Sequence, residues 1–408
     1  MGEDQGVGKS EEFCAGNASA SALLPRACVL PSLALGLFLA ACAGGDVPTA
    51  PALRQAPGLP LPTEERVIGE GNTTVAMLLP LSAGGSASGL AQSFQNAAEL
   101  ALTEAGTDNV RILVIDTGGE GDKARAAAEA AVANGAQLIL GPVFSPAVSG
   151  AGEPARASRV PMIAFSTDAT TTGRGVYLLS FLPRQDATRI VEYASEQGVK
   201  TFGGLVPDNG YGLVMEAAFR EAVAAKGGRV VGVQRYQPGE IASAAAELTS
   251  RGPFEAVFVP NGGDDPAAAA AALSSQGFSA RLLGSGQWDS PEVIRAQGIT
   301  GAWYPGPQEG GYEAFAQRYQ TKYQGEPPRT ASLVYDATLL ANGLVGARGA
   351  SAFQKPSIES SDGFVGVDGI FRLTGNGLSE RGLAVYEVKG GGTADIVSPA
   401  PKSFARSF

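Results

Sequence analysis

Short apolar runs alternate with helical stretches from Thr74 onward, and this alternation is the feature that most limits what the chain can fold into. The first apolar runs are Val75–Leu79, Val110–Ile115, Leu138–Leu140 and Pro161–Phe165. Small and apolar residues between them recur at helical spacing, as at Phe94, Ala97, Leu100 and Ala101. Because strands that alternate with helices run parallel, the pattern predicts an α/β fold whose parallel sheet is flanked by helices on both faces.

A second set of apolar runs begins after Pro183 and has a similar size. Its runs are Phe202–Val206, Val230–Val233, Ala256–Val259 and Leu282–Leu283. Two successive α/β sets of this kind predict two lobes. The turn-forming residues Thr374–Gly377 then separate the runs Gly369–Leu373 and Leu383–Val388, which predicts a hairpin near the C-terminus.

The composition favours a binding protein over an enzyme. The chain has 408 residues, 44% of them hydrophobic, which is enough for a large core, and its net charge of −10 argues against nucleic acid as a partner. It contains no histidine, which removes the commonest general base, the Ser-His and Cys-His nucleophile pairs and the usual zinc ligand. Acid–base chemistry by carboxylates alone stays open. We expect no enzyme activity, no cofactor and no metal.

The N-terminal segment has the features of a lipoprotein signal. Val29–Ala41 is a short apolar run preceded by Arg26, and its end, Leu39-Ala40-Ala41-Cys42, resembles the bacterial lipobox. Cys42 would then be the lipidated first residue of the mature chain, and the Pro-rich residues 42–72 a tether. Acidic residues ahead of the apolar run do not fit a secretion signal, which favours a basic start. We expect residues 1–41 to be a signal segment and the protein to be lipid-anchored to a membrane of the bacterial envelope, in the periplasm.

Polar residues follow two strands at the place where a ligand crevice is expected. The run Leu138–Leu140 ends at Gly141-Pro142, shortly before Ser145, and the run Pro161–Phe165 ends at Ser166-Thr167-Asp168. Ligands of open parallel sheets bind beyond the carboxyl ends of the strands, so these polar groups would face one crevice. Ordinary solvated loops would look similar, and the pattern alone leaves both interpretations open.

This stretch resembles the type I periplasmic-binding family, specifically its leucine-type, branched-chain amino-acid-binding proteins. The similarity extends from about Thr74 to about Val388, and the chain also resembles a non-transport branch of the fold, the lipoprotein activators of penicillin-binding proteins. The resemblance implies a two-lobe hinged clamp whose chain crosses between the lobes three times, near Leu182–Pro183, Trp303–Pro305 and Phe371–Thr374. We expect lobe 1 at 73–182 plus 305–370, lobe 2 at 183–304 plus 371–395, and a tail at 396–408.

The same resemblance implies a set of ligand-binding residues. Ser145 matches the family's ligand-holding serine, and Ser166, Thr167 and Asp168 match its second cluster. Hydroxyls and backbone N–H groups suit a ligand carboxylate, while Asp168 could take an ammonium. Tyr211 matches the tyrosine that closes over the ligand from the second lobe.

The second lobe also departs from the family pattern. Gln287 completes the set of candidate ligand residues, but neither it nor Gly286 is the carboxylate that the family carries near this register. No aromatic residue stands at the second tyrosine register near Asn261, and Trp288 could either stack on a ligand or plug the crevice. These departures weaken an amino-acid ligand, because a zwitterion without an ammonium partner would leave a buried charge unpaired.

Two functions follow from the resemblance. In the first, the protein is a non-enzymatic solute-binding protein that captures an amino-acid-like small molecule and passes it to a membrane transporter. In the second, it is a tethered adaptor that activates a penicillin-binding protein in peptidoglycan synthesis by protein contact. Ser145 and the fold favour capture, whereas the lipid anchor and the second-lobe departures favour the adaptor. We expect capture.

Overall fold

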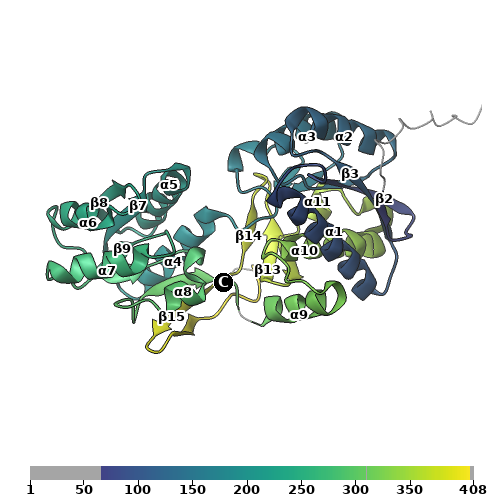
Figure 1. The fold of residues 1–408 in the computed structure, drawn as a ribbon. Helices are drawn as coiled ribbons and strands as arrows, with labels where there is room; N and C mark the ends of the chain where they lie inside the picture. The colour runs from purple at the N-terminus through teal and green to yellow at the C-terminus, as the bar shows by residue number, and fades with distance from the viewer. Residues whose placement is uncertain (1–65, 309, 405–408) are drawn as a thin grey trace, which may run out of the picture. The chain divides into compact units, whose positions relative to one another are not determined.

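The computed structural model describes residues 66–308 and 310–404, which form a two-lobe α/β fold (Figure 1). The sheet of the first lobe has six strands in the order β1-β3-β2-β4-β5-β6. They are β1 (Arg66–Ile68), β2 (Thr73–Leu79), β3 (Val110–Asp116), β4 (Leu138–Leu140), β5 (Met162–Ala164) and β6 (Val176–Leu178). All neighbouring strands run parallel except the edge strand β1, which is antiparallel to β3. The predicted parallel sheet is confirmed.

Strand β2 shows why this sheet is covered on both faces. Alternate side chains of a strand point to opposite faces, so a strand that is apolar throughout needs a layer on each side. Met77 belongs to one buried cluster and its neighbours Ala76 and Leu78 to another. Helices α2 (Gly121–Ala133) and α3 (Ser145–Ala157) pack side by side over the second cluster.

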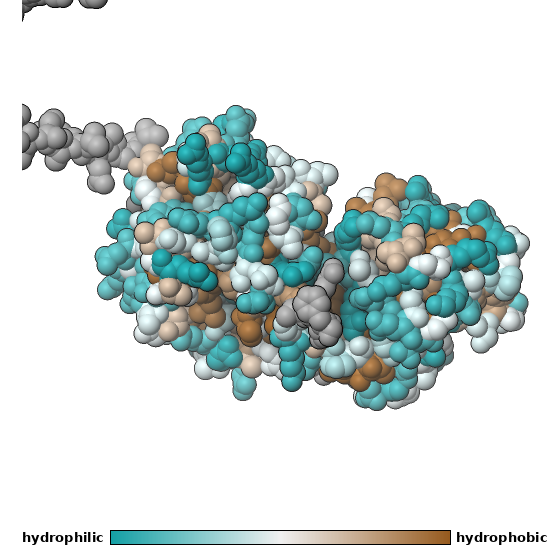
Figure 2. All heavy atoms as spheres, turned by 180° about the vertical axis from the view of Figure 1, so that it is seen from behind, coloured by the Kyte–Doolittle hydropathy of each residue, from teal (hydrophilic) through white to brown (hydrophobic). Residues whose placement is uncertain are grey.

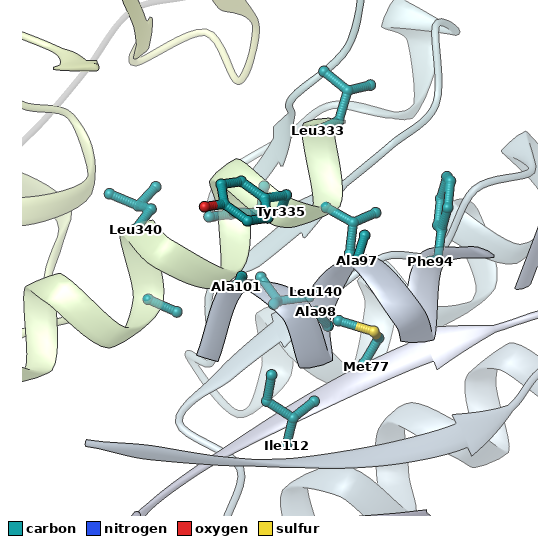
Figure 3. Packing of buried hydrophobic residues seen from close by; sticks show 14 of the residues in the cluster. Met77, Phe94, Ala97, Ala98, Ala101, Ile112, Leu140, Leu333, Tyr335 and Leu340 are labelled. Atoms are coloured by element: carbon teal, nitrogen blue, oxygen red, sulfur yellow. The ribbon is translucent and has the colours of Figure 1, made fainter. Parts of the chain in front are cut away.

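The opposite face of the first sheet carries α1 (Ser86–Ala105), with α10 (Ala331–Arg348) packed along it. Figure 3 shows Met77, Ile112 and Leu140 of the sheet beneath the alanines of α1, with Tyr335 and Leu340 of α10 beside that helix. Two shorter helices, α9 (Gly311–Tyr323) and α11 (Lys355–Ile358), add Phe315, Tyr319 and Ile358 to this cluster. A large part of the first core therefore comes from residues after 310.

The second lobe is built on a seven-stranded sheet in the order β16-β15-β11-β10-β9-β7-β8. Its parallel strands are β7 (Thr201–Pro207), β8 (Arg229–Tyr236), β9 (Ala256–Phe258), β10 (Arg281–Leu283) and β11 (Trp303–Gly306). The antiparallel strands β15 (Ala384–Lys389) and β16 (Thr393–Ser398) complete it. Its helices are α4 (Pro183–Glu196), α5 (Gly210–Ala225), α6 (Ile241–Thr249), α7 (Asp265–Ser275) and α8 (Pro291–Ile294).

A small third sheet corrects the hairpin that the sequence predicts. It consists of β12 (Phe364–Gly366), β13 (Gly369–Leu373) and β14 (Ser379–Arg381), in that order. The turn after β13 leads into β14, while the run Leu383–Val388 forms β15 in the second lobe. The predicted hairpin is wrong because β15 pairs with β11 of the second sheet, where Val385 and Tyr386 are buried.

Two crossings between the lobes also lie later than expected. Pro305 is a residue of β11 in the second sheet, so the chain passes back to the first lobe after Gly306. Phe371 and Leu373 belong to the first core, and the last crossing therefore follows Arg381 rather than Phe371–Thr374. The reason is burial, because both side chains are only 1% exposed within the first lobe.

The outer boundaries differ from the expected tether and tail as well. Residues 66–68 lie within the expected tether 42–72 but form β1, which is held by backbone pairing with β3. The first residues of the expected tail 396–408 belong to β16, which pairs with β15. The signal segment 1–41 and Cys42 lie outside the described residues.

No helix in the described part of the chain is long and apolar enough to cross a membrane. On the face that Figure 2 shows, hydrophilic side chains predominate and apolar ones gather in separate patches. The few large apolar side chains that are exposed include Phe144 at the start of α3 and Leu213 and Val214 at the start of α5.

Candidate functional site

The first-lobe candidates come together where β4 and β5 end. Ser145 is the first residue of α3, Ser166 follows β5, and their Oγ atoms lie 3.4 Å apart. The turn after β4 depends on Gly141, which has a φ of 85°, and a Cβ there would lie 2.4 Å from the carbonyl oxygen of Leu78. Close approach of the backbone at this glycine thus brings the Ser145 hydroxyl to the end of the neighbouring strand.

Asp168 is hydrogen-bonded to the same cluster, but its carboxylate already accepts hydrogen bonds from Thr170. Its backbone N–H donates to Ser166 Oγ at 3.1 Å, and its Oδ1 accepts from the N–H and the hydroxyl of Thr170, at 3.0 and 2.7 Å. Asp168 therefore caps a short 3₁₀ helix at 169–171. The hydrogen bonds from Thr170 hold the pKa of Asp168 below its usual value, so the group is charged at neutral pH. Thr167 is exposed beside this cluster.

In the second lobe, Tyr211 stands at the start of α5. The Asn209 side chain caps this helix by accepting from the Gly212 N–H at 2.9 Å. The Tyr211 hydroxyl lies 3.2 Å from the Pro260 carbonyl oxygen and 3.1 Å from Ser285 Oγ, and burial raises the pKa of its phenol. Because this hydroxyl is engaged within the lobe, contact with a ligand would come chiefly from the ring.

Gln287 and Trp288 occupy different environments. Gln287 is exposed, and its Oε1 accepts from the Gly262 N–H at 3.1 Å. Trp288 is fully buried, and its indole N–H donates to the carbonyl oxygens of Val259 and Asn261, both at 3.0 Å. Trp288 is therefore a core residue of the second lobe, and neither of the two crevice roles that the sequence left open fits it.

Two residues near this group escaped the sequence analysis. Ser285 is completely buried, and its hydroxyl donates to the Pro260 carbonyl at 2.5 Å. Asp186, in the first turn of α4, accepts from the Gly286 N–H at 2.9 Å, and burial raises its pKa from 3.8 to about 7. Acidic residues are common in first helical turns, so the sequence around Asp186 is not distinctive. What distinguishes Asp186 is its hydrogen bond with Gly286, which is 100 residues away in the chain.

A cavity of about 870 Å³ near the chain crossings is lined by other residues. Its lining includes Gln185 and Arg189 of α4, Ser379 and Arg381 of β14, and Phe404. Within the described residues, no group of three or more acidic or cysteine side chains could hold a metal ion. The candidate ligand groups are hydroxyls, carboxylates and an aromatic ring, which are groups that can bind a small polar molecule.

Comparison with known proteins assigns the chain to a family. The family model described as periplasmic binding protein matches residues 72–393, most of the chain. The chain belongs to the periplasmic binding protein family. Its fold is the type I form, which the leucine-binding proteins share. No curated protein matches the chain.

Solved structures with the same fold are distant in sequence. A candidate branched-chain amino acid ABC transporter protein from Rhodospirillum rubrum has 21% identity and a TM-score of 0.70, with 80% of this chain and 99% of that chain covered. A solute-binding protein of an ABC transporter from R. palustris, in complex with benzoate, has 20% identity and a TM-score of 0.54, with 83% and 98% covered.

A branched-chain amino acid transporter substrate-binding protein from Streptococcus pneumoniae, in complex with isoleucine, is a third similar structure. It has 19% identity and a TM-score of 0.54, with 80% of this chain and 99% of that chain covered. At these identities the likeness concerns the fold.

Proposed function

We propose that this protein is a non-enzymatic solute-binding protein that captures an amino-acid-like molecule in the cell envelope and delivers it to an ABC-type membrane transporter. The observation that carries the proposal is the pair of hydroxyls, Ser145 and Ser166, 3.4 Å apart beyond two neighbouring parallel strands. Ligands of open parallel sheets bind at this position, which supports the pair as part of a ligand site.

Hydroxyl groups and the exposed start of a helix favour a carboxylate. Ser145 is the first residue of α3, a helix of 13 residues whose N-terminal N–H groups and dipole attract negative charge. The similar R. palustris and S. pneumoniae structures hold benzoate and isoleucine, each of which has a carboxylate on an apolar body. The exposed Phe144 and Leu213 beside the candidate residues could contact such a body.

The second lobe would cover the ligand through Tyr211. Its ring is partly buried and its hydroxyl is fixed, so little side-chain freedom is lost when a ligand packs against it. Closure of the two lobes would then be stabilised by any ligand that binds the closed form better than the open one. Lipidation at Cys42 would keep the protein at the membrane that holds the transporter.

The test is calorimetric titration of the purified chain from residue 43 onward with the common L-amino acids and with benzoate. The double change of Ser145 and Ser166 to alanine should weaken binding by about tenfold or more, because two neutral hydrogen bonds are worth about 1–3 kcal/mol together. Lys322→Ala, on α9 and paired with Glu99, is the control and should bind like wild type.

Two outcomes would contradict capture. One is that wild type binds none of these molecules. The other is that the double variant binds the ligand as tightly as wild type does. Stimulation of a penicillin-binding protein by a wild type that binds no small molecule would favour the adaptor function instead.

A further inference from the structure

The segment that follows the last strand returns from the second lobe to the first. β16 ends at Ser398, and residues 399–404 form neither helix nor strand. Val385 of β15 pairs with Ser398, and a Cβ on Gly382 would lie 3.1 Å from Cγ of Pro401. Residues 399–404 therefore run beside the third crossing in the opposite direction, toward the third sheet.

Two prolines keep residues 399–404 extended. Pro399 and Pro401 each have a fixed φ and no N–H group, and each restricts the residue before it to an extended conformation. The segment therefore cannot continue the hydrogen-bond ladder of β16 through these two positions. At about 3.1 Å per residue, an extended segment of this length spans roughly 19 Å, which suits a connection between two lobes.

The start of this segment is fixed to the second lobe. Arg189 of α4 donates to the Leu383 carbonyl at 2.8 Å and to Ser398 Oγ at 2.5 Å. Ala400 packs against the buried cluster of the second lobe that contains Trp288. Arg189 thus joins the third crossing, at Leu383, to the point where the segment leaves β16.

The end of the segment packs on the third sheet. The guanidinium of Arg372 in β13 lies 4.7 Å from the ring centroid of Phe404, and Arg372 itself pairs with Glu380 of β14 at 2.6 Å. A Cβ on Gly363 would lie 2.8 Å from Cδ2 of Phe404, so a side chain at position 363 would displace the ring. Because Phe371, next to Arg372, belongs to the first core, Phe404 is held by the first lobe.

Between its two ends the segment borders a cavity. Pro399, Pro401 and Phe404 line the cavity of about 870 Å³, together with residues of α4 in the second lobe and of β14 in the first. Protein cores are close-packed, so a cavity of this size is not the interior of either lobe. Phe404 also belongs to none of the four buried clusters of the described chain. Its ring can therefore leave Arg372 without opening a core.

We propose that residues 399–404 form a strap that connects the lobes a fourth time and limits how far they separate. The three crossings are continuous chain, whereas the strap is held at its far end by the packing of one ring. The strap can therefore detach and attach again. Attachment favours arrangements of the lobes in which Phe404 reaches Arg372, and detachment gives access to others. This role belongs to the free protein and requires no ligand, so it is independent of the proposed function.

The test measures the separation of the lobes with two spin labels on the full chain. The labels are attached at Ala157→Cys in α3 and Ala271→Cys in α7, which are exposed positions of the first and the second lobe. The native cysteines are replaced by serine so that only the labelled positions react, namely Cys14, Cys28 and Cys42. Pulsed electron spin resonance then gives the distribution of distances between the labels.

Phe404→Ala should broaden this distribution, because it removes the ring that packs on Arg372. The fraction of molecules outside the main wild-type population should rise by about threefold to tenfold. Phe404→Tyr keeps the aromatic face and should behave as wild type. Lys402→Ala changes an exposed residue of the same strap and is the matched control, which should also behave as wild type.

Urea denaturation of the same variants separates a strap from a structural role of Phe404. The urea midpoint of Phe404→Ala should equal that of wild type, because Phe404 lies outside the buried clusters. A distribution that Phe404→Ala leaves unchanged would overturn the proposal. A broader distribution together with a lower midpoint would also overturn it, since Phe404 would then be part of the folded core. So would a Lys402→Ala chain that broadens as much as Phe404→Ala does.

Discussion

Asp186→Asn should make the protein more stable at high pH, because burial disfavours the charged form of the wild-type carboxylate. The rise of the Asp186 pKa from 3.8 to about 7 means that the folded chain keeps a proton which the unfolded chain has already released. The stabilising contribution of this group is fully present below the unfolded pKa and is lost as the pH rises through about 7. Asparagine mimics the protonated form at every pH.

The size of the effect follows from the same difference in pKa. The interval from 3.8 to about 7 is worth at most about 4 kcal/mol, at about 1.4 kcal/mol per pH unit. Asp186 is only partly buried, so solvent screens its charge, and we expect Asp186→Asn to raise the free energy of unfolding by about 2–4 kcal/mol at pH 8. At pH 4.5 the gain should shrink to about 1 kcal/mol or less.

Urea denaturation followed by tryptophan fluorescence is a suitable assay. The chain has two tryptophans, Trp288 and Trp303, and both belong to the second lobe, as Asp186 does. Asp336 of the first lobe also has a pKa raised to about 7 by burial, but it is common to both proteins and cancels in the comparison. Glu196→Gln, which makes the same change from carboxylate to amide at an exposed position of α4, is the control and should follow wild type at both pH values.

An Asp186→Asn protein that is less stable than wild type at pH 8 would refute this reasoning. It would mean that the bond between the charged carboxylate and the Gly286 N–H outweighs the penalty of burial, and that Asp186 is a structural residue of α4.

The remaining predictions concern the anchor and the core of the second lobe. Cys42→Ala should move the protein from the membrane fraction to the soluble fraction in cell fractionation, and a variant that stays in the membrane fraction as wild type does would exclude lipidation at this residue. Trp288→Phe should destabilise the protein by about 2–4 kcal/mol, because it leaves the carbonyls of Val259 and Asn261 without their donor and removes buried volume. Circular dichroism in urea measures this loss, and an unchanged midpoint would show that these two hydrogen bonds are replaced.

The sequence was most informative where structure is local. An apolar run such as Val75–Leu79 must be covered on both faces, so strand type, sheet type and flanking helices all follow from short segments. The sequence does not predict which strand a given strand pairs with, and Leu383–Val388 is an example. That run would look the same beside β14 or beside β11, and only the apolar surface next to β11 decides.

The same limit applies to the candidate site. Ser145 and Ser166 follow strands that neighbour each other in the sheet, so their approach could be expected from the order of the elements. Asp186 and Gly286 are 100 residues apart and come from a helix and a 3₁₀ turn. No periodicity or spacing links such positions. The sequence therefore could not predict that the second lobe has a carboxylate, that of Asp186, bonded to Gly286.

Several core residues of the first lobe lie far along the chain, which affects how the chain can fold while it is being synthesised. The first sheet is complete by Leu178, yet Phe315, Leu340 and Phe371 of its core lie more than a hundred residues further on. The second sheet likewise needs β15, near the C-terminus, to cover the edge of β11. A nascent chain that stops before Ala331 has no α10 to pack along α1, so apolar surface stays open and cooperative burial is delayed.

This delay would favour the export that the proposed envelope location requires. A polypeptide that collapsed early, lobe by lobe, on the ribosome would resist being threaded through a narrow translocation channel. Here the core of the first lobe includes Phe371 and Leu373, and the sheet of the second lobe includes β15, so the discontinuous order of the lobes would delay folding until most of the chain has emerged.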